Sequence, residues 1–275
     1  MVGLNQIASG SLLFLGILDG LLAFCVFFRP TDFHRWFFGR PPEGSGVLLT
    51  RTGGIWLTFS VLQLTAFFLW NDNPFWLLLV TGVRLSEWCA DWLLLLTEQR
   101  FTILGSMGFL LSSPFTISFA LLFYGTFAHT QVITASQFSI GGFSPLPWVL
   151  DGLLVGLSLV DLVLAYLALF DHEQWLEWFH SSDKQIDREW LTRTGGVWLG
   201  FAVLQLVALG LWRSYPALLI IIGGVRLTES LADWIYLSVL ERTKTVVAVC
   251  LCLSPPANIA LAYVFYQGYF TIQVF

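Results

Sequence analysis

Eight long apolar segments divide this sequence, and they constrain the fold more than any other feature. A helix needs about 20 apolar residues to cross the hydrocarbon core of a membrane. The runs are continuous rather than alternating, which favours helices over membrane-spanning strands. The sequence therefore predicts an all-α integral membrane protein with eight transmembrane helices. These are Ser9–Phe28, Leu48–Trp70, Phe75–Leu96, Phe101–Phe123, Trp148–Phe170, Leu191–Trp212, Ala217–Leu240 and Thr243–Tyr266.

The composition agrees with a chain that is solvated largely by lipid. Hydrophobic residues make up 56% of it and charged residues only 11%, whereas a soluble domain carries about 25% charged residues. The net charge of −5 is small. A nucleic-acid partner is not expected, because it would require a basic face.

The chain repeats itself at an offset of 142 residues. Thr50–Gly54 matches Thr192–Gly196, and Gly82–Leu85 matches Gly224–Leu227, without a gap. Such self-similarity indicates a gene duplication. We expect residues 1–127 to form one four-helix transmembrane repeat, 128–147 an uncharged linker, and 148–275 a second four-helix repeat. Because each repeat has an even number of spans, the two are expected to be parallel, with a pseudo-twofold axis along the membrane normal.

Basic residues predict the orientation, because lysine and arginine are enriched on the cytoplasmic side. The loops after spans 1, 3, 5 and 7 hold Arg29, Arg35, Arg40, Arg100, Lys184, Arg188, Arg242 and Lys244, and the opposite side holds only Arg213. Both termini should therefore lie outside, with those four loops in the cytoplasm of a bacterial inner or plasma membrane. In the long loops, Thr31–Phe38 and Asp171–His180 are expected to be interfacial helices. Anchoring is favoured for them over docking of a partner.

Each repeat places the same five ionisable residues inside its spans. Such residues cost about 2.5–3.5 kcal/mol each on insertion scales and usually face the protein interior. They are Asp19, Arg51, Arg84, Glu87 and Asp91, then Asp161, Arg193, Arg226, Glu229 and Asp233.

Depth along the helices predicts which of these charges pair. Residues 84, 87 and 91 share one helical face. A rise of about 1.5 Å per residue puts Asp19 level with Arg84, and Asp91 level with Arg51. We therefore expect Asp19–Arg84 and Asp91–Arg51 pairs, repeated as Asp161–Arg226 and Asp233–Arg193.

One carboxylate in each repeat is left over, since three acids face two arginines. Glu87 and Glu229 are the expected extra groups, and each is a candidate proton or cation site. A carboxyl without a cationic partner in hydrocarbon is expected to take up a proton. Alternatively, it accepts a hydrogen bond from Gln63 or Gln205.

Glycines and prolines suggest details of packing. Thr-Gly-Gly at the start of spans 2 and 6 lacks the pattern of a phosphate loop, so its glycines are expected to permit close helix approach. Pro114 and Pro256 lie within spans 4 and 8 and are expected to kink them.

The buried charges allow a structural and a functional interpretation. They could fix how the helices pack, or they could form a relay for protons or cations. Packing is favoured, because the full set of charges occurs within each repeat and in both repeats, as expected if each four-helix bundle needs it to fold. The first hypothesis is thus a non-catalytic accessory or scaffold subunit of a larger membrane assembly. The second is a proton- or cation-coupled transporter or channel, and the third a lipid- or isoprenoid-binding protein or enzyme.

Other chemistry is not indicated by the sequence. All four histidines lie in loops or near span ends, no residue set has metal-site spacing, and no Ser-His-acid arrangement can be assembled at one depth. We expect no catalytic or metal-binding residues and no cofactor. The expected partners are bound membrane lipids and other membrane-protein subunits.

Overall fold

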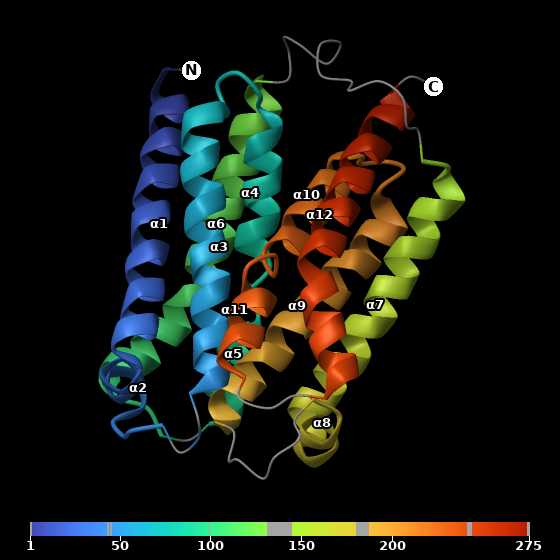
Figure 1. Ribbon diagram of the computed structural model, residues 1–275. Coiled ribbons are helices and arrows are strands. Elements are labelled where there is room, and N and C mark those ends of the chain that lie inside the picture. Colours follow the sequence, from blue (N-terminus) through green and yellow to red (C-terminus); the bar gives the residue numbers. More distant parts are fainter. Residues whose placement is uncertain are drawn as a thin grey trace.

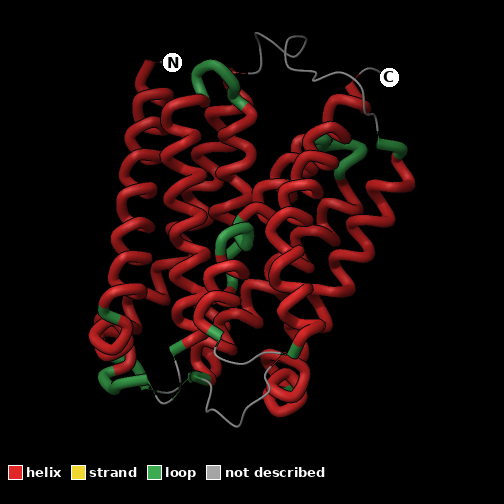
Figure 2. Tube along the Cα trace, in the orientation of Figure 1, coloured by secondary structure: helices red, strands yellow, loops and turns green. Residues whose placement is uncertain are grey.

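A computed structural model of the chain describes residues 2–42, 44, 46–98, 100–130, 145–179, 187–240 and 244–273. This part is all-helical, with twelve helices and no strand (Figures 1 and 2). Most of the expected linker, residues 131–144, lies outside the described residues. The helices are α1 Val2–Phe28, α2 Pro30–Phe38, α3 Val47–Leu69, α4 Phe75–Leu85, α5 Ala90–Thr97, α6 Ile103–Thr130, α7 Pro147–Phe170, α8 His172–Phe179, α9 Arg188–Leu211, α10 Ala217–Leu227, α11 Ala232–Val239 and α12 Thr245–Gln273.

Within the described residues, six helices are long and apolar enough to cross a membrane. They are α1, α3, α6, α7, α9 and α12. Large apolar side chains on the outside of the bundle are widely exposed, including Phe68 at 71% and Leu96 at 82%. A soluble protein rarely exposes an apolar surface of this extent. Length, composition and surface together identify a membrane protein.

Two of the expected spans are interrupted. The sequence predicted single helices over Phe75–Leu96 and Ala217–Leu240, and this was wrong: α4 ends before α5 begins, and α10 before α11. Tight-turn hydrogen bonds fill the first gap, from Trp88 N to Leu85 O and from Ala90 N to Glu87 O, each 3.2 Å. Figure 2 shows a non-helical segment at mid-height in the bundle, where Figure 1 has the α10–α11 connection. The break lets the residues after it point in a new direction.

The bundle consists of two groups of helices joined through the interrupted ones. Figure 1 shows α1, α3, α4 and α6 on one side and α7, α9, α10 and α12 on the other. Between the groups, α4 contacts α10, α5 contacts α9, and α11 contacts α3. The start of α1 and the end of α12 lie at the same end of the bundle, opposite α2 and α8 (Figure 1). Each half therefore extends a short helix into the other half.

Glycines permit the close contacts between the halves. An ideal Cβ on Gly82 of α4 would lie 1.9 Å from Ile221 O of α10, and one on Gly224 would lie 2.0 Å from Leu79 O. The backbones of α4 and α10 thus cross with no room for a side chain. In a membrane, small residues at a crossing allow helices to associate by close packing.

The Thr-Gly-Gly segments also permit close approach, as predicted. A Cβ on Gly53 would meet Val26 of α1, whereas a Cβ on Gly54 would lie 2.8 Å from the Cα of Ala232 in α11. In the second half, a Cβ on Gly196 would lie at the same 2.8 Å from the Cα of Ala90 in α5. The first glycine of each pair therefore permits close packing within its own half, and the second permits close packing between the halves.

In α6 and α12, a proline leaves a backbone carbonyl without its helical N–H donor, and a tryptophan indole N–H donates to that carbonyl instead. Proline has no N–H, so Pro114 cannot donate to the carbonyl of residue 110. Trp92 Nε1 donates to Leu110 O instead, at 3.1 Å, and Trp234 Nε1 donates to Cys252 O at 3.0 Å, four residues before Pro256. Both helices continue through these prolines. The repeated tryptophans therefore compensate for the repeated prolines.

Replacing Trp92 with phenylalanine should lower the free energy of unfolding by about 1 kcal/mol, since it removes one hydrogen bond to a lipid-facing carbonyl. The loss should shrink in a Pro114→Ala background, because the new N–H supplies the missing donor. Trp148→Phe, at a tryptophan with 69% exposure, is the matched control and should be neutral. Equal losses with and without Pro114 would contradict this account. Chemical unfolding in detergent measures all four variants.

Polar contacts of Asp187 and Glu189 join the loop after α2 to the start of α9. Gly44 N and Gly46 N donate to the carboxylate of Asp187 at 2.7 and 3.0 Å, and Arg40 forms an ion pair with Glu189. Burial raises the pKa of Asp187 above its ordinary value, although the two N–H donors and nearby His34 act to lower it. These contacts also join the two halves, at the N-terminal end of α9.

Candidate functional site

The buried charges form four clusters, two within the halves and two between them. We name each cluster by one of its members. The Asp19 cluster is Asp19, Gln63 and Arg84, and the Asp161 cluster is Asp161, Gln205 and Arg226. The Arg193 cluster is Trp56, Glu87, Asp91 and Arg193, and the Arg51 cluster is Arg51, Trp198, Glu229 and Asp233.

The Asp19 cluster lies within the first half and joins α1, α3 and α4. Arg84 Nη1 lies 2.6 Å from Asp19 Oδ2, and Gln63 Nε2 donates to the same oxygen at 2.6 Å. The guanidinium of Arg84 also lies over the ring of Phe59, 5.2 Å from its centroid. The Asp19–Arg84 pair expected from depth along the helices is present.

The Asp161 cluster repeats this arrangement in the second half. Arg226 Nη1 lies 2.8 Å from Asp161 Oδ2, and Gln205 Nε2 donates to that oxygen at 2.6 Å. The Asp161–Arg226 pair is thus also present. One contact is additional: Arg226 Nε donates to Asn258 Oδ1 of α12 at 3.1 Å.

The Arg193 cluster joins the two halves. Arg193, on α9, lies with its Nε 2.7 Å from Asp91 Oδ1 and its Nη2 2.8 Å from Glu87 Oε1. Trp56 completes the cluster, since its Nε1 donates to Glu87 Oε2 at 3.3 Å and its ring lies 5.2 Å from the guanidinium. One arginine of the second half is therefore held by three residues of the first.

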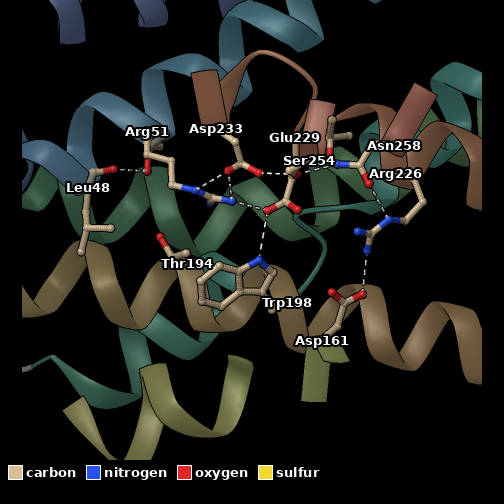
Figure 3. A network of polar contacts seen from close by, with 12 residues as sticks. Leu48, Arg51, Asp161, Thr194, Trp198, Arg226, Glu229, Asp233, Ser254 and Asn258 are labelled. Carbon is tan, nitrogen blue, oxygen red and sulfur yellow. Dashed lines mark hydrogen bonds and ion pairs between the residues drawn. The ribbon is translucent and has the colours of Figure 1, made fainter. Parts of the chain in front are cut away.

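The Arg51 cluster is the reciprocal arrangement (Figure 3). Arg51, on α3, lies with its Nη2 3.0 Å from Asp233 Oδ1 and forms an ion pair with Glu229. Trp198 Nε1 donates to Glu229 Oε1 at 3.0 Å, and the Trp198 ring lies 5.2 Å from the guanidinium. These side chains come from α3, α9, α11 and the turn before α11, and Figure 3 shows them converging.

Two expected pairings were therefore wrong. Asp91 pairs with Arg193 and not with Arg51, and Asp233 pairs with Arg51 and not with Arg193. The reason is the break before α5 and α11, which sends each short helix to the other half. The set of charges is consequently not complete within one repeat.

The expectation that Glu87 and Glu229 lack a cation was also wrong. Glu87 contacts Arg193, and Glu229 contacts Arg51. The uncharged side chains that donate hydrogen bonds to these glutamates are Trp56 and Trp198. The glutamines expected in that role, Gln63 and Gln205, donate to Asp19 and Asp161 instead. Each exchanged arginine nevertheless faces two carboxylates, so each half keeps one formal negative charge in excess.

In the first half, a cavity of about 260 Å³ is bordered by two of these clusters. Its charged floor comes from the Asp19 and Arg193 clusters, and its walls are largely aromatic and aliphatic. The lining residues are Leu18, Asp19, Leu22, Phe33, Phe37, Trp56, Arg84, Glu87, Asp91, Gly108, Phe109, Ser112, Phe115, Thr116 and Arg193. Among the described residues, no group of three or more His, Cys, Asp and Glu side chains could hold a metal ion.

Sequence reasoning missed several members of this site. The tryptophans Trp56 and Trp198 were visible only as matching positions of the repeat, although an indole N–H is a natural donor to a buried carboxylate. Thr116, Ser254 and Asn258 carried no signal of their own. Their proximity to the charges depends on where α6 and α12 pack.

The chain matches no protein-family model, no curated protein and no solved structure. Its function must therefore be inferred from the geometry of the site.

Proposed function

We propose that this chain is an eight-span integral membrane protein made of two parallel four-helix repeats, residues 1–127 and 148–275. The six long helices would be joined in the membrane by two interrupted spans. The 11 residues of α4 and the 8 of α5 together rise about 28 Å, which is close to a hydrocarbon core of about 30 Å. The repeats would be related by an axis along the membrane normal.

The proposed orientation has both termini outside and α2 and α8 at the cytoplasmic surface. The start of α1 and the end of α12 lie at one end of the bundle, and α2 and α8 at the other (Figure 1). The latter end carries Arg29, Arg35, Arg40 and Arg188, as the enrichment of basic residues at the cytoplasmic face requires. The loops after spans 1, 3, 5 and 7 would then be cytoplasmic.

The proposed role is that of a rigid, non-catalytic accessory or scaffold subunit of a membrane assembly. One observation carries it: each half holds the buried arginine of the other with two carboxylates. Removing one partner of such a pair costs about 3–5 kcal/mol. A transporter whose halves rock against each other would have to open both clusters and the α4–α10 crossing. The geometry therefore favours a fixed unit over a moving one.

Purification from native membranes in mild detergent tests this role. We expect the chain to migrate with other membrane-protein subunits, and spin labels on α1 and α7 to keep one distance distribution between pH 5 and pH 8. Glu87→Gln should not create or remove any proton flux in proteoliposomes. The scaffold proposal fails if the protein runs alone and the proteoliposomes acidify in a manner that Glu87→Gln abolishes.

A further inference from the structure

The cavity of the first half has its exposed lining residues on α6 and half-buried ones on α1, so we infer that its open side faces the seam where these two helices meet. At its outer side lie Leu18 and Leu22 of α1, which are half-buried, and Phe115 of α6, which is 38% exposed. At its inner side lie the carboxylates and guanidiniums of two clusters. A cavity with an apolar entrance and a polar end suits an amphiphilic molecule that enters sideways from the lipid.

In the second half, polar side chains of the protein itself form hydrogen bonds to the aspartate and the arginine at the equivalent positions. Ser254 Oγ donates to Asp233 Oδ2 at 2.5 Å, Asn258 Nδ2 donates to Ser254 Oγ at 3.3 Å, and Asn258 Oδ1 accepts from Arg226 Nε at 3.1 Å. Figure 3 shows this chain of contacts running from Asp233 to Arg226. A donor to the aspartate and an acceptor for the arginine thus come from one helix, α12.

The first half has a threonine where the second half has this asparagine. Ser112 and Thr116 stand at the positions of Ser254 and Asn258 in the repeat, and both line the cavity. Among the described residues, Ser112 makes no hydrogen bond to Asp91, and Thr116 Oγ1 lies 3.5 Å from Arg84 Nη2. Arg84 is 5% exposed, and its Nε has no hydrogen-bond partner among the described residues. A buried donor without a partner is costly.

We propose that this cavity binds the uncharged head of an amphiphile, a head that carries both a hydrogen-bond acceptor and a hydrogen-bond donor. The acceptor faces Arg84 Nε and the donor faces Asp91, so that the head takes the place of the bridge that Ser254 and Asn258 form in the second half. A glycerol diol or a carboxamide has this chemistry.

The charge of the floor excludes an anionic head. The lining includes three carboxylates, of Asp19, Glu87 and Asp91, and two guanidiniums, of Arg84 and Arg193. Its formal charge is therefore negative when all five are ionised. An anionic head would bring a like charge into a medium of low dielectric constant, where repulsion is strong.

The cavity is too small to enclose a whole amphiphile, so the tail of the proposed ligand extends into the membrane. Pockets that enclose a drug-sized ligand measure about 300–1,000 Å³, and this cavity measures about 260 Å³. It holds a head group and the first carbons of a chain. The rest of the tail lies along the α1–α6 seam, against Leu18, Leu22 and Phe115.

Native mass spectrometry of the full-length protein, with monooleoylglycerol as the probe and oleate as its anionic counterpart, tests the proposal. We expect one monooleoylglycerol per chain and roughly tenfold weaker binding of oleate. Thr116→Asn, which introduces the bridge of the second half, should weaken monooleoylglycerol binding by roughly tenfold. Ser112→Leu, which fills part of the cavity with an apolar side chain, should do the same. Asn258→Thr is the matched control and should keep the binding in the first half.

The outcomes separate this proposal from the scaffold role. Unchanged monooleoylglycerol binding in both Thr116→Asn and Ser112→Leu would overturn the cavity as the site. Oleate binding as tight as monooleoylglycerol, and lost in the same variants, would keep the site and overturn the uncharged head. Neither variant alters an exchanged ion pair, so these results leave the test of the rigid scaffold independent.

Discussion

Replacing Arg193 with glutamine is expected to lower the free energy of unfolding by about 3–5 kcal/mol, because it leaves two buried carboxylates without their cation. Arg193 is 1% exposed and contacts both Glu87 and Asp91. Reversible unfolding in mixed detergent, followed by tryptophan fluorescence, measures the loss. Arg213→Gln is the control, since Arg213 pairs with Asp151 at a side-chain exposure of 59%, and it should cost at most about 1 kcal/mol.

A double-mutant cycle identifies the partner of Arg193. Arg193→Gln and Asp91→Asn should show a coupling energy of about 1–3 kcal/mol, because the two side chains are in contact. Arg51→Gln and Asp91→Asn should be additive within about 0.5 kcal/mol. Coupling in the second cycle and additivity in the first would mean that the charges pair within each half, contrary to the structure.

Replacing Gly82 with valine is expected to prevent the halves from packing. Even a Cβ at this position would lie 1.9 Å from Ile221 O. Overpacked side chains cost about 1–3 kcal/mol when their neighbours can adjust. Here the neighbour is the backbone of α10, so the loss should exceed about 3 kcal/mol. The measurements are the yield of monodisperse protein and its unfolding free energy.

Gly156→Val is the matched control for this substitution. Gly156 lies on α7 with nothing within 4 Å of its ideal Cβ, and valine has a slightly higher helix propensity than glycine. The control should therefore fold with unchanged or slightly higher stability. If Gly82→Val and Gly156→Val behave alike, α4 and α10 do not cross as closely as described.

Much of the helical arrangement could be predicted from the sequence, because apolar runs and helical rise are local properties. The long helices α1, α3, α6, α7, α9 and α12 coincide with predicted spans. The Asp19–Arg84 pair followed from depth together with the assumption that charges pair within one half, which holds for this pair. The short helices α2 and α8 followed from amphipathic pattern.

The exchange of charges between the halves could not be predicted, and the reason is the repeat itself. Arg51 and Arg193 occupy equivalent positions, so they lie at equivalent depths in two parallel repeats. An argument from depth alone cannot tell which of them Asp91 contacts. The break between α4 and α5 determines which arginine Asp91 contacts. The segment Ser86–Cys89 contains no proline or glycine that would predict this break.

The cavity was equally hidden from sequence reasoning. Its proposed contact with a ligand depends on the difference between Thr116 and Asn258 at one repeated position, among many positions that differ. That difference gains meaning only when α12 is seen to bring Asn258 within reach of Arg226. Comparing the two halves in three dimensions then shows which contact the first half does not make for itself.

Disulfide trapping between the halves tests the exchange most directly. In a background whose only native cysteine is Cys89, with a protease site in the linker, the pairs to compare are Cys89 with Gly200→Cys and Cys89 with Thr58→Cys, the position that matches Gly200 in the first repeat. An ideal Cβ on Gly200 lies 3.4 Å from Cys89 Sγ, close to the roughly 3 Å that an S–S bond of about 2.05 Å sets between one Cβ and the other sulfur. We predict that the first pair holds the two fragments together on a non-reducing gel after cleavage. Separation of the fragments in the first pair, with oxidation of the second pair inside the N-terminal fragment, would contradict the exchange on which the account rests.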